Sequence, residues 1–353
     1  MVRSFPPRAL AAVLLVPACA TEPTRFVAGP EDPTLLEGLT GSFLVREIDA
    51  APIDREIQRY TLPDRRHRTW KLDHGATNFS GPDEEGRIVY NVDDHGFYLS
   101  STQVIPATHD IRVAWVDGRT EEILVHEDGL LWGGDVLALS PSGGWVAYLQ
   151  SHFGGQQLLT VFRIGESAKW HRDLGTKPAG GLHWLNDGKL LLRTGSMDWK
   201  DTPPEFRPAE PEPSWNGDPA AVPLVFLLDV ETGKERILCR GVRPLPTAGQ
   251  SLAVLACDET GYFTVDAETR ERLRPGRPLP GALERGSYVI GALDADRVLY
   301  LARPTEGTKV RTYYDPYKCA YCARPTVKVA DLTRGTFATV VQNVMPPITS
   351  YGR

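Results

Sequence analysis

The sequence predicts an all-β protein built as a single β-propeller, and three observations support this prediction. Thirty-three glycines and 29 prolines exclude long helices, because a glycine costs about 1 kcal/mol and a proline about 3 kcal/mol in a helix interior. Short apolar or alternating segments recur between turn-forming residues, as strands do. These segments group into a unit that repeats about every 45 residues, the spacing of propeller blades.

The clearest repeat unit covers residues 135–174. Its four short strand segments are separated by Ser-Pro-Ser-Gly-Gly, Phe-Gly-Gly and Gly-Glu-Ser, which are turn sequences. Each such sheet is apolar on both faces, so neighbouring sheets must stack around a common axis. A pair of β-sandwiches is the alternative, but a single repeated period disfavours it. Including a weaker first unit of three strands, we expect six blades, within a range of five to seven, beginning near residues 42, 87, 135, 181, 242 and 287.

One strand-turn-strand segment carries a family resemblance. The run Leu139-Ser-Pro-Ser-Gly-Gly-Trp-Val-Ala-Tyr148 resembles the signature of TolB-like and related WD40-like periplasmic propellers, with Ser142 in place of the usual Asp. Residues 184–188, Trp-Leu-Asn-Asp-Gly, are a partial second copy. The resemblance implies a propeller over residues 39–345, followed by a C-terminal tail at 346–353.

The N-terminus has the pattern of an exported protein. Residues 1–18 combine two arginines with a short apolar run, which is typical of a signal peptide. Val16-Pro-Ala-Cys19 resembles a bacterial lipobox, although proline is unusual in its middle. This implies that Cys19 carries diacylglycerol and a further acyl chain such as palmitate, and that Ala20 after it directs the protein to the outer membrane. An ordinary secretory signal is the alternative. We expect residues 19–38 to form a flexible tether.

Four further cysteines lie within the predicted propeller. Cys239 and Cys257 fall on neighbouring blades, so a disulfide between them is plausible in an oxidising compartment. Cys319 and Cys322 form a C-x-x-C pair within an insertion at 303–325, where a small disulfide is the simplest interpretation. Free thiols, a metal site or a redox role are the alternatives for this pair.

Motifs for catalysis, metals or cofactors are mostly missing from the sequence. The run His171-Arg-Asp-Leu174 starts like a kinase catalytic loop but lacks the other kinase motifs. No G-x-S-x-G, H-E-x-x-H or Walker sequence occurs, and the eight histidines are scattered. We therefore predict no catalytic residues, no metal and no cofactor. The net charge of −6 argues against nucleic-acid binding, and the basic run at 65–68 with Lys71 is interpreted as a solvated strand edge.

The segment most suited to binding a partner is the insertion at residues 195–221. It is rich in proline and acidic residues, and it carries the aromatic residues Trp199, Phe206 and Trp215. Exposed aromatic residues on long loops are typical binding anchors. A merely solvated insertion is the alternative.

These observations favour one function and leave a second open. The favoured hypothesis is a monomeric, non-catalytic lipoprotein of the cell envelope, whose propeller binds another envelope protein, a peptide or a ligand. The alternative is an envelope enzyme, of hydrolase, lyase or lactonase type, with its site in the propeller channel. Such a site can be assembled from single residues of several blades and leaves no linear motif.

Overall fold

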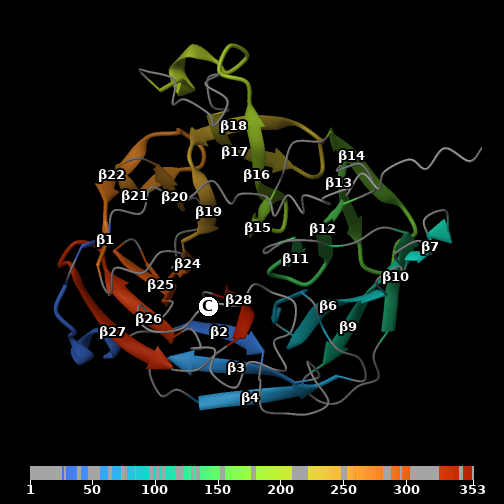
Figure 1. Cartoon of the computed structure of the whole chain (residues 1–353), viewed down its shortest axis with the longest axis horizontal. Helices are drawn as coiled ribbons and strands as arrows, with labels where there is room; N and C mark the ends of the chain where they lie inside the picture. Colours follow the sequence, from blue (N-terminus) through green and yellow to red (C-terminus); the bar gives the residue numbers. More distant parts are fainter. Residues whose placement is uncertain are drawn as a thin grey trace, which may run out of the picture.

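Among the residues that the structure describes, six four-stranded antiparallel sheets are arranged around a central axis in the computed structural model, which confirms the predicted all-β propeller (Figure 1). In the part of the chain that the structure describes, no helix is long and apolar enough to cross a membrane. The structure describes residues 26–27, 29–37, 41–46, 56–62, 66–72, 76, 78–83, 85–94, 98–100, 103–104, 108–115, 122–128, 131, 136–151, 156–175, 180–208, 222–247, 253–258, 260–280, 288–294, 296–302, 326–341 and 345–351.

Each sheet forms one blade, and its strands are named here from the axis outward. Blade 1 contains β28 (Met345–Tyr351), β2 (Gly41–Arg46), β3 (Glu56–Leu62) and β4 (Arg66–Lys71); blade 2 contains β5 (Asn78–Ser80), β6 (Arg87–Asp94), β9 (Thr108–Trp115) and β10 (Glu122–Asp128). Blade 3 contains β11 (Leu137–Leu139), β12 (Trp145–Ser151), β13 (Gln157–Arg163) and β14 (Lys169–Gly175); blade 4 contains β15 (Gly180–Asn186), β16 (Lys189–Met197), β17 (Val222–Asp229) and β18 (Glu235–Arg240). Blade 5 contains β19 (Val242–Pro246), β20 (Ala253–Asp258), β21 (Gly261–Asp266) and β22 (Arg272–Arg277); blade 6 contains β24 (Tyr288–Ala292), β25 (Arg297–Ala302), β26 (Thr326–Asp331) and β27 (Thr336–Val341).

Blade 1 is assembled from both ends of the described chain. Its three outer strands come from the N-terminal part, and β28 from the C-terminal part pairs with β2, with Ser42 opposite Tyr351. This pairing corrects the predicted domain boundary, because residues 346–351, predicted to belong to a tail, are part of the propeller strand β28. It also explains why the first repeat unit shows only three strands in the sequence.

The region predicted to be a flexible tether is docked on the ring over part of its length. β1 (Phe26–Val27) pairs in parallel with β23 (Leu279–Pro280), beside blade 5. Glu31 bridges Phe337 of β27, and the short helix η1 (Pro33–Leu36) buries Leu35. The tether prediction is therefore wrong for this stretch, whose contacts involve single residues and leave no periodic pattern in the sequence.

The hydrophobic core lies between the blades. Blades 1 and 2 share a cluster containing Leu44 and Ile88, and one large cluster runs through blades 2, 3 and 4. Further clusters join blades 4 and 5, blades 5 and 6, and blades 6 and 1. Every blade thus buries side chains against both of its neighbours.

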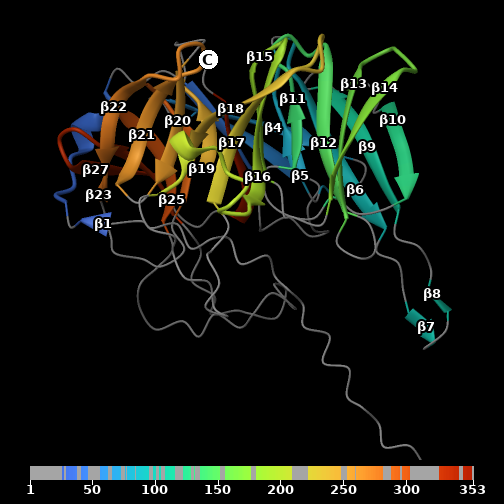
Figure 2. The ribbon, with the colours of Figure 1, turned by 90° about the horizontal axis from the view of Figure 1, so that it is seen from above.

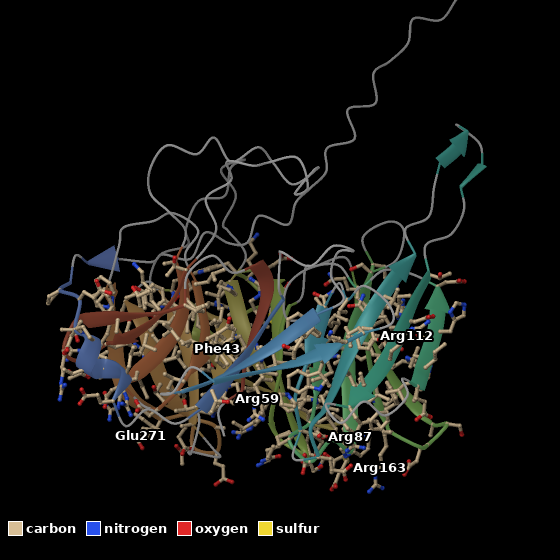
Figure 3. The ribbon with its side chains drawn as sticks, turned by 90° about the horizontal axis from the view of Figure 1, so that it is seen from below. Phe43, Arg59, Arg87, Arg112, Arg163 and Glu271 are labelled. Atoms are coloured by element: carbon tan, nitrogen blue, oxygen red, sulfur yellow. The ribbon has the colours of Figure 1, made fainter. Side chains whose placement is uncertain are left out.

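The strands run between two faces of the ring when it is seen from the side (Figure 2). We call one of them the turn face, because in blades 3, 4 and 6 it carries the turns that join the first to the second strand and the third to the fourth strand. Arg87, Arg163 and Glu271 lie along this face in Figure 3. Aspartates open several of its turns: Asp229, Asp266 and Asp331 each accept backbone N–H groups from residues two or three positions ahead.

A polar chain links the turns of three neighbouring blades. The buried carboxylate of Asp83 in blade 2 accepts hydrogen bonds from the Arg87 N–H and from Arg87 Nε, at 2.8 and 2.6 Å. Arg87 in turn donates to the Gly143 carbonyl of blade 3, at 3.1 Å. In the next turn, Asp187 of blade 4 accepts the N–H of Ser142 at 2.9 Å. The Ser-Pro-Ser-Gly-Gly turn therefore has its polar groups bound by both neighbouring blades.

Charged groups also join blades 2 and 3. Glu127 of β10 accepts a hydrogen bond from the Tyr148 hydroxyl at 2.7 Å and pairs with Lys169 of β14. Burial alone would raise the pKa of Glu127, but the hydrogen bonds from Lys169 and Tyr148 outweigh it and lower the pKa. Burial raises the pKa of Tyr148, and the Glu127 carboxylate raises it further. The two blades are thus joined around a stable carboxylate.

Removing β28 should open the ring. A chain truncated after residue 344 loses the strand that pairs with β2, and each net hydrogen bond contributes about 1 kcal/mol. The hydrogen bonds lost with β28 together make up a large part of the free energy of unfolding, which is typically about 5–15 kcal/mol for a folded domain. We expect a much lower midpoint in urea unfolding, whereas truncation after Tyr351 leaves the midpoint unchanged. Equal midpoints for the two truncated chains would contradict the closure.

Candidate functional site

A cleft of about 190 Å³ lies between blades 5 and 6. Its floor is apolar and is formed by Leu255, Tyr262 and Leu332, which are 1%, 2% and 8% exposed. Its rim is charged or polar. The rim residues are Arg274 and Arg277 from β22, Asp296 from the first turn of blade 6, and Thr333 from its last turn.

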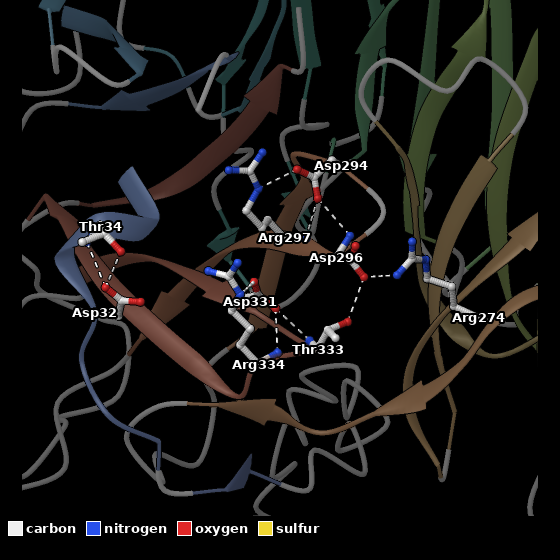
Figure 4. Close-up of polar contacts among 9 residues, drawn as sticks. All are labelled: Asp32, Thr34, Arg274, Asp294, Asp296, Arg297, Asp331, Thr333 and Arg334. Carbon is white, nitrogen blue, oxygen red and sulfur yellow. Dashed lines mark hydrogen bonds and ion pairs between the residues drawn. The ribbon is translucent and has the colours of Figure 1, made fainter. Parts of the chain in front are cut away.

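The two turns of blade 6 hold the acidic side of the rim in place (Figure 4). Asp294 accepts the N–H groups of Asp296 and Arg297 at 2.9 and 2.7 Å. Asp331 accepts the N–H of Thr333 at 2.9 Å, and the Thr333 hydroxyl donates to Asp296 at 2.8 Å. The Asp296 carboxylate is therefore fixed by both turns.

Arg274 and Asp296 form an ion pair across the cleft mouth. Their side chains are 43% and 37% exposed. An ion pair this open to solvent contributes only about 0–1 kcal/mol. A ligand carboxylate can therefore take the place of Asp296 on Arg274 at little cost in free energy.

Irregular pairing of β22 sets the direction of its arginines. Two register shifts interrupt its pairing with β21, where Arg272, Arg274 and Arg277 lie opposite Val265, Thr264 and Tyr262. Each shift places one extra residue in β22, and one extra residue turns the following side chains to the other face of the sheet. Arg272 accordingly pairs with Asp258, whereas Arg274 and Arg277 line the cleft.

The sequence Pro275-Gly276 explains the register shift between Arg274 and Arg277. Proline has no N–H to give to a strand ladder. A Cβ atom on residue 276 would lie 1.9 Å from the Thr260 hydroxyl oxygen, so only glycine fits there. The Arg-Pro-Gly-Arg run at 274–277 therefore has a structural requirement at its centre and a charge at each end.

Sequence reasoning missed this basic run. The sequence interpretation names residues 65–68 with Lys71 as the basic cluster, yet residues 270–277 hold four arginines. The signal was visible in the composition of this segment. What the sequence does not show is that the bulges separate the arginines, so that two of the four face the cleft.

The aromatic residues predicted to bind a partner are packed against their own blade. Trp199 and Phe206 contact the cluster of Val222, Leu224 and Phe226, and both are half-buried. The Arg207 guanidinium lies 5.1 Å from the centre of the Trp199 ring. A role of these two rings in binding stays a prediction, and Trp215 lies outside the described residues.

The cysteine predictions have two outcomes. Cys239 is a buried free thiol in β18, which corrects the predicted bridge to Cys257. The β20 residues in the hydrophobic cluster of Cys239 are Val254 and Ala256. Burial raises the pKa of Cys239 to about 12, although Arg272 opposes this. Cys19, Cys319 and Cys322 lie outside the described residues.

The structure also places the kinase-like run of the sequence and allows a search for metal ligands. The run His171-Arg-Asp-Leu174 lies on β14, the outermost strand of blade 3, where the His171 side chain is exposed. Among the residues that the structure describes, no three His, Cys, Asp or Glu side chains come together as metal ligands would.

The fold places the chain in the class of β-propellers, with a small cleft between two blades as its candidate site. No protein-family model matches the chain, and no curated protein does. Among solved structures it is similar to TolB from Acinetobacter baumannii, with a TM-score of 0.51 and 11% identity, over 91% of this chain and 70% of that one.

Two further similarities are weaker. A putative TolB from Agrobacterium tumefaciens has a TM-score of 0.44 and 12% identity, covering 89% of this chain and 98% of that one. An oligogalacturonate lyase in complex with manganese has a TM-score of 0.46 and 9% identity, covering 79% of this chain and 72% of that one. At such identities the likeness concerns the fold. The chain thus has the TolB-like propeller fold that its sequence predicts.

The environment of Cys239 predicts its reactivity. Because the thiol is buried and its pKa is raised to about 12, hardly any thiolate forms near neutral pH. We expect no alkylation of Cys239 in the native protein and full alkylation in denaturant without any reductant, as measured by mass spectrometry of its tryptic peptide. If alkylation in denaturant requires a reductant, Cys239 is in a disulfide and the assignment as a free thiol is wrong.

Proposed function

We propose that this protein is a non-catalytic binding scaffold of the cell envelope, anchored to the outer membrane through lipid on Cys19, whose propeller holds a partner protein. The size of the cleft between blades 5 and 6 is the observation that carries the proposal. Pockets that bind small molecules usually measure about 300–1,000 Å³. The cleft, at about 190 Å³, is smaller and suits a single anchoring side chain of a protein.

The layout of the cleft supports the same function. Protein interfaces place a desolvated apolar anchor at the centre and polar groups around it. The cleft has this order, with Tyr262 and Leu332 at its floor and Arg277 and Thr333 at its rim. The turns opened by Asp294 and Asp331 hold the rim rigidly, so a partner orders few groups on binding.

The proposed anchor rests on the sequence Val16-Pro-Ala-Cys19. One acyl chain alone gives weak, reversible membrane binding, whereas several chains on one cysteine give stable anchoring. An anchored propeller would meet its partner within the envelope, where a modest affinity suffices because both proteins share a small volume.

The anchor is tested by Cys19→Ser. We expect the wild-type protein to sediment with outer-membrane vesicles and to carry acyl chains detectable by mass spectrometry. The variant should lose the acyl chains and appear in the soluble envelope fraction. Sedimentation of Cys19→Ser together with the membranes would contradict lipid anchoring, and Ala18→Ser is a control that keeps the cysteine.

The binding cleft is tested by Thr333→Phe, which fills the cleft mouth from an exposed position. Thr269→Phe is the matched control, because Thr269 occupies the corresponding Asp-opened turn of blade 5, is also exposed, and does not line the cleft. After cross-linking in cells, we expect a partner captured by the wild type and by Thr269→Phe to be lost with Thr333→Phe. An identical set of captured proteins for all three would overturn the proposed function.

A further inference from the structure

We infer that the cleft binds an extended acidic segment of the partner, with glutamate or aspartate side chains on Arg274 and Arg277 and one apolar side chain on the floor. This inference rests on the proposed function and adds the chemistry of the ligand. Its starting point is charge: the lining residues hold two arginines and one aspartate, in a chain whose net charge is −6.

The surplus positive charge is available to a ligand. Arg277 is exposed and makes no ion pair with any residue in the described part of the chain. Arg274 has Asp296, but both of these side chains are more than a third exposed. An arginine guanidinium presents paired donors that match a carboxylate, so both arginines suit acidic side chains.

The bulges of β22 are the second independent observation. Without them, the alternation along the strand would not bring Arg274 and Arg277 to one face, because they are three residues apart. The inserted residue between them, at the Pro275-Gly276 step, brings both side chains to the cleft. Bulges commonly aim a side chain at a functional site.

The apolar floor narrows the ligand class. Leu255, Tyr262 and Leu332 are nearly buried below the arginines. A ligand that covers this floor gains hydrophobic free energy, which a purely charged group does not. The favoured ligand therefore combines carboxylates with an aliphatic or aromatic side chain, as an acidic peptide segment does.

The outer edge of β22 does not favour pairing with a partner strand. β22 is the last strand of its sheet, so its outer edge has no strand neighbour among the described residues. Pro275, the two bulges and the charges are features that prevent edge-to-edge pairing. We therefore assign recognition to the side chains at the cleft and not to an added β-strand.

The test uses the full chain and a fluorescently labelled peptide of glutamates around one phenylalanine. We expect the fluorescence anisotropy of the peptide to rise when the protein binds it. The affinity of the protein for the peptide should fall as salt is added. Replacing its glutamates by glutamine, or its phenylalanine by alanine, should weaken binding. Arg277→Glu should weaken it at least about fivefold, because charge reversal replaces attraction by repulsion.

Arg163→Glu is the matched control. Arg163 is an exposed arginine on blade 3, so this variant changes the net charge equally but leaves the cleft intact. Equal losses for Arg163→Glu and Arg277→Glu would overturn the inference, since binding would then follow net charge alone. Arg277-dependent binding to vesicles of anionic lipid, without binding to the peptide, would overturn it in favour of a lipid surface.

The outcomes separate this inference from the proposed function. If Thr333→Phe abolishes capture of a partner while the acidic peptide does not bind, the partner uses the cleft with a different chemistry and only the inference fails. If the captured proteins are unchanged by Thr333→Phe, the proposed function itself fails.

Discussion

The burial of both faces of every sheet is the constraint on which this structure depends. A four-stranded sheet that is apolar on both faces cannot be stable alone, because it exposes one face or the other to water. Here each blade shares a hydrophobic cluster with the blade on either side. The arrangement works only as a closed ring, so the pairing of β28 with β2 determines whether blades 1 and 6 can bury their facing sides.

The local part of this fold could be predicted from the sequence, and its closure could not. Turn sequences such as Ser-Pro-Ser-Gly-Gly and the repeat of about 45 residues are short-range signals, and they predict six blades. Closure joins residues that are about 300 positions apart. The strand that closes the ring contains Pro346 and Pro347, which argue against a strand because proline lacks the N–H of a ladder. β28 tolerates both because they are the extra residues of a register shift: Ile348 lies opposite Val45 and Met345 opposite Arg46, so neither proline takes part in the regular ladder.

The candidate site was hidden from the sequence for a different reason. Its rim combines Arg274 of blade 5 with Asp296 and Thr333 of blade 6, which belong to two repeat units and share no motif. The direction of Arg274 also depends on a register shift, which alternation along the strand does not reveal. By contrast, the composition of residues 195–221 predicts a binding role for Trp199 and Phe206, and the structure shows both rings packed against a hydrophobic cluster of blade 4.

A comparison of the contacts at two blade junctions shows why charge is the informative feature of the cleft. Between blades 2 and 3, the carboxylate of Glu127 is met by Lys169 and by the Tyr148 hydroxyl, so that one negative charge is matched by one positive charge. Between blades 5 and 6, the cleft is lined by two arginines and one aspartate, and Asp296 pairs with Arg274 but not with Arg277. A junction that served only to hold its two blades together would gain nothing from an unmatched charge, because an exposed unpaired arginine adds little to stability. The unmatched arginine is the part of the cleft that stability leaves unexplained, and the acidic segment that we infer as ligand would supply its missing carboxylate.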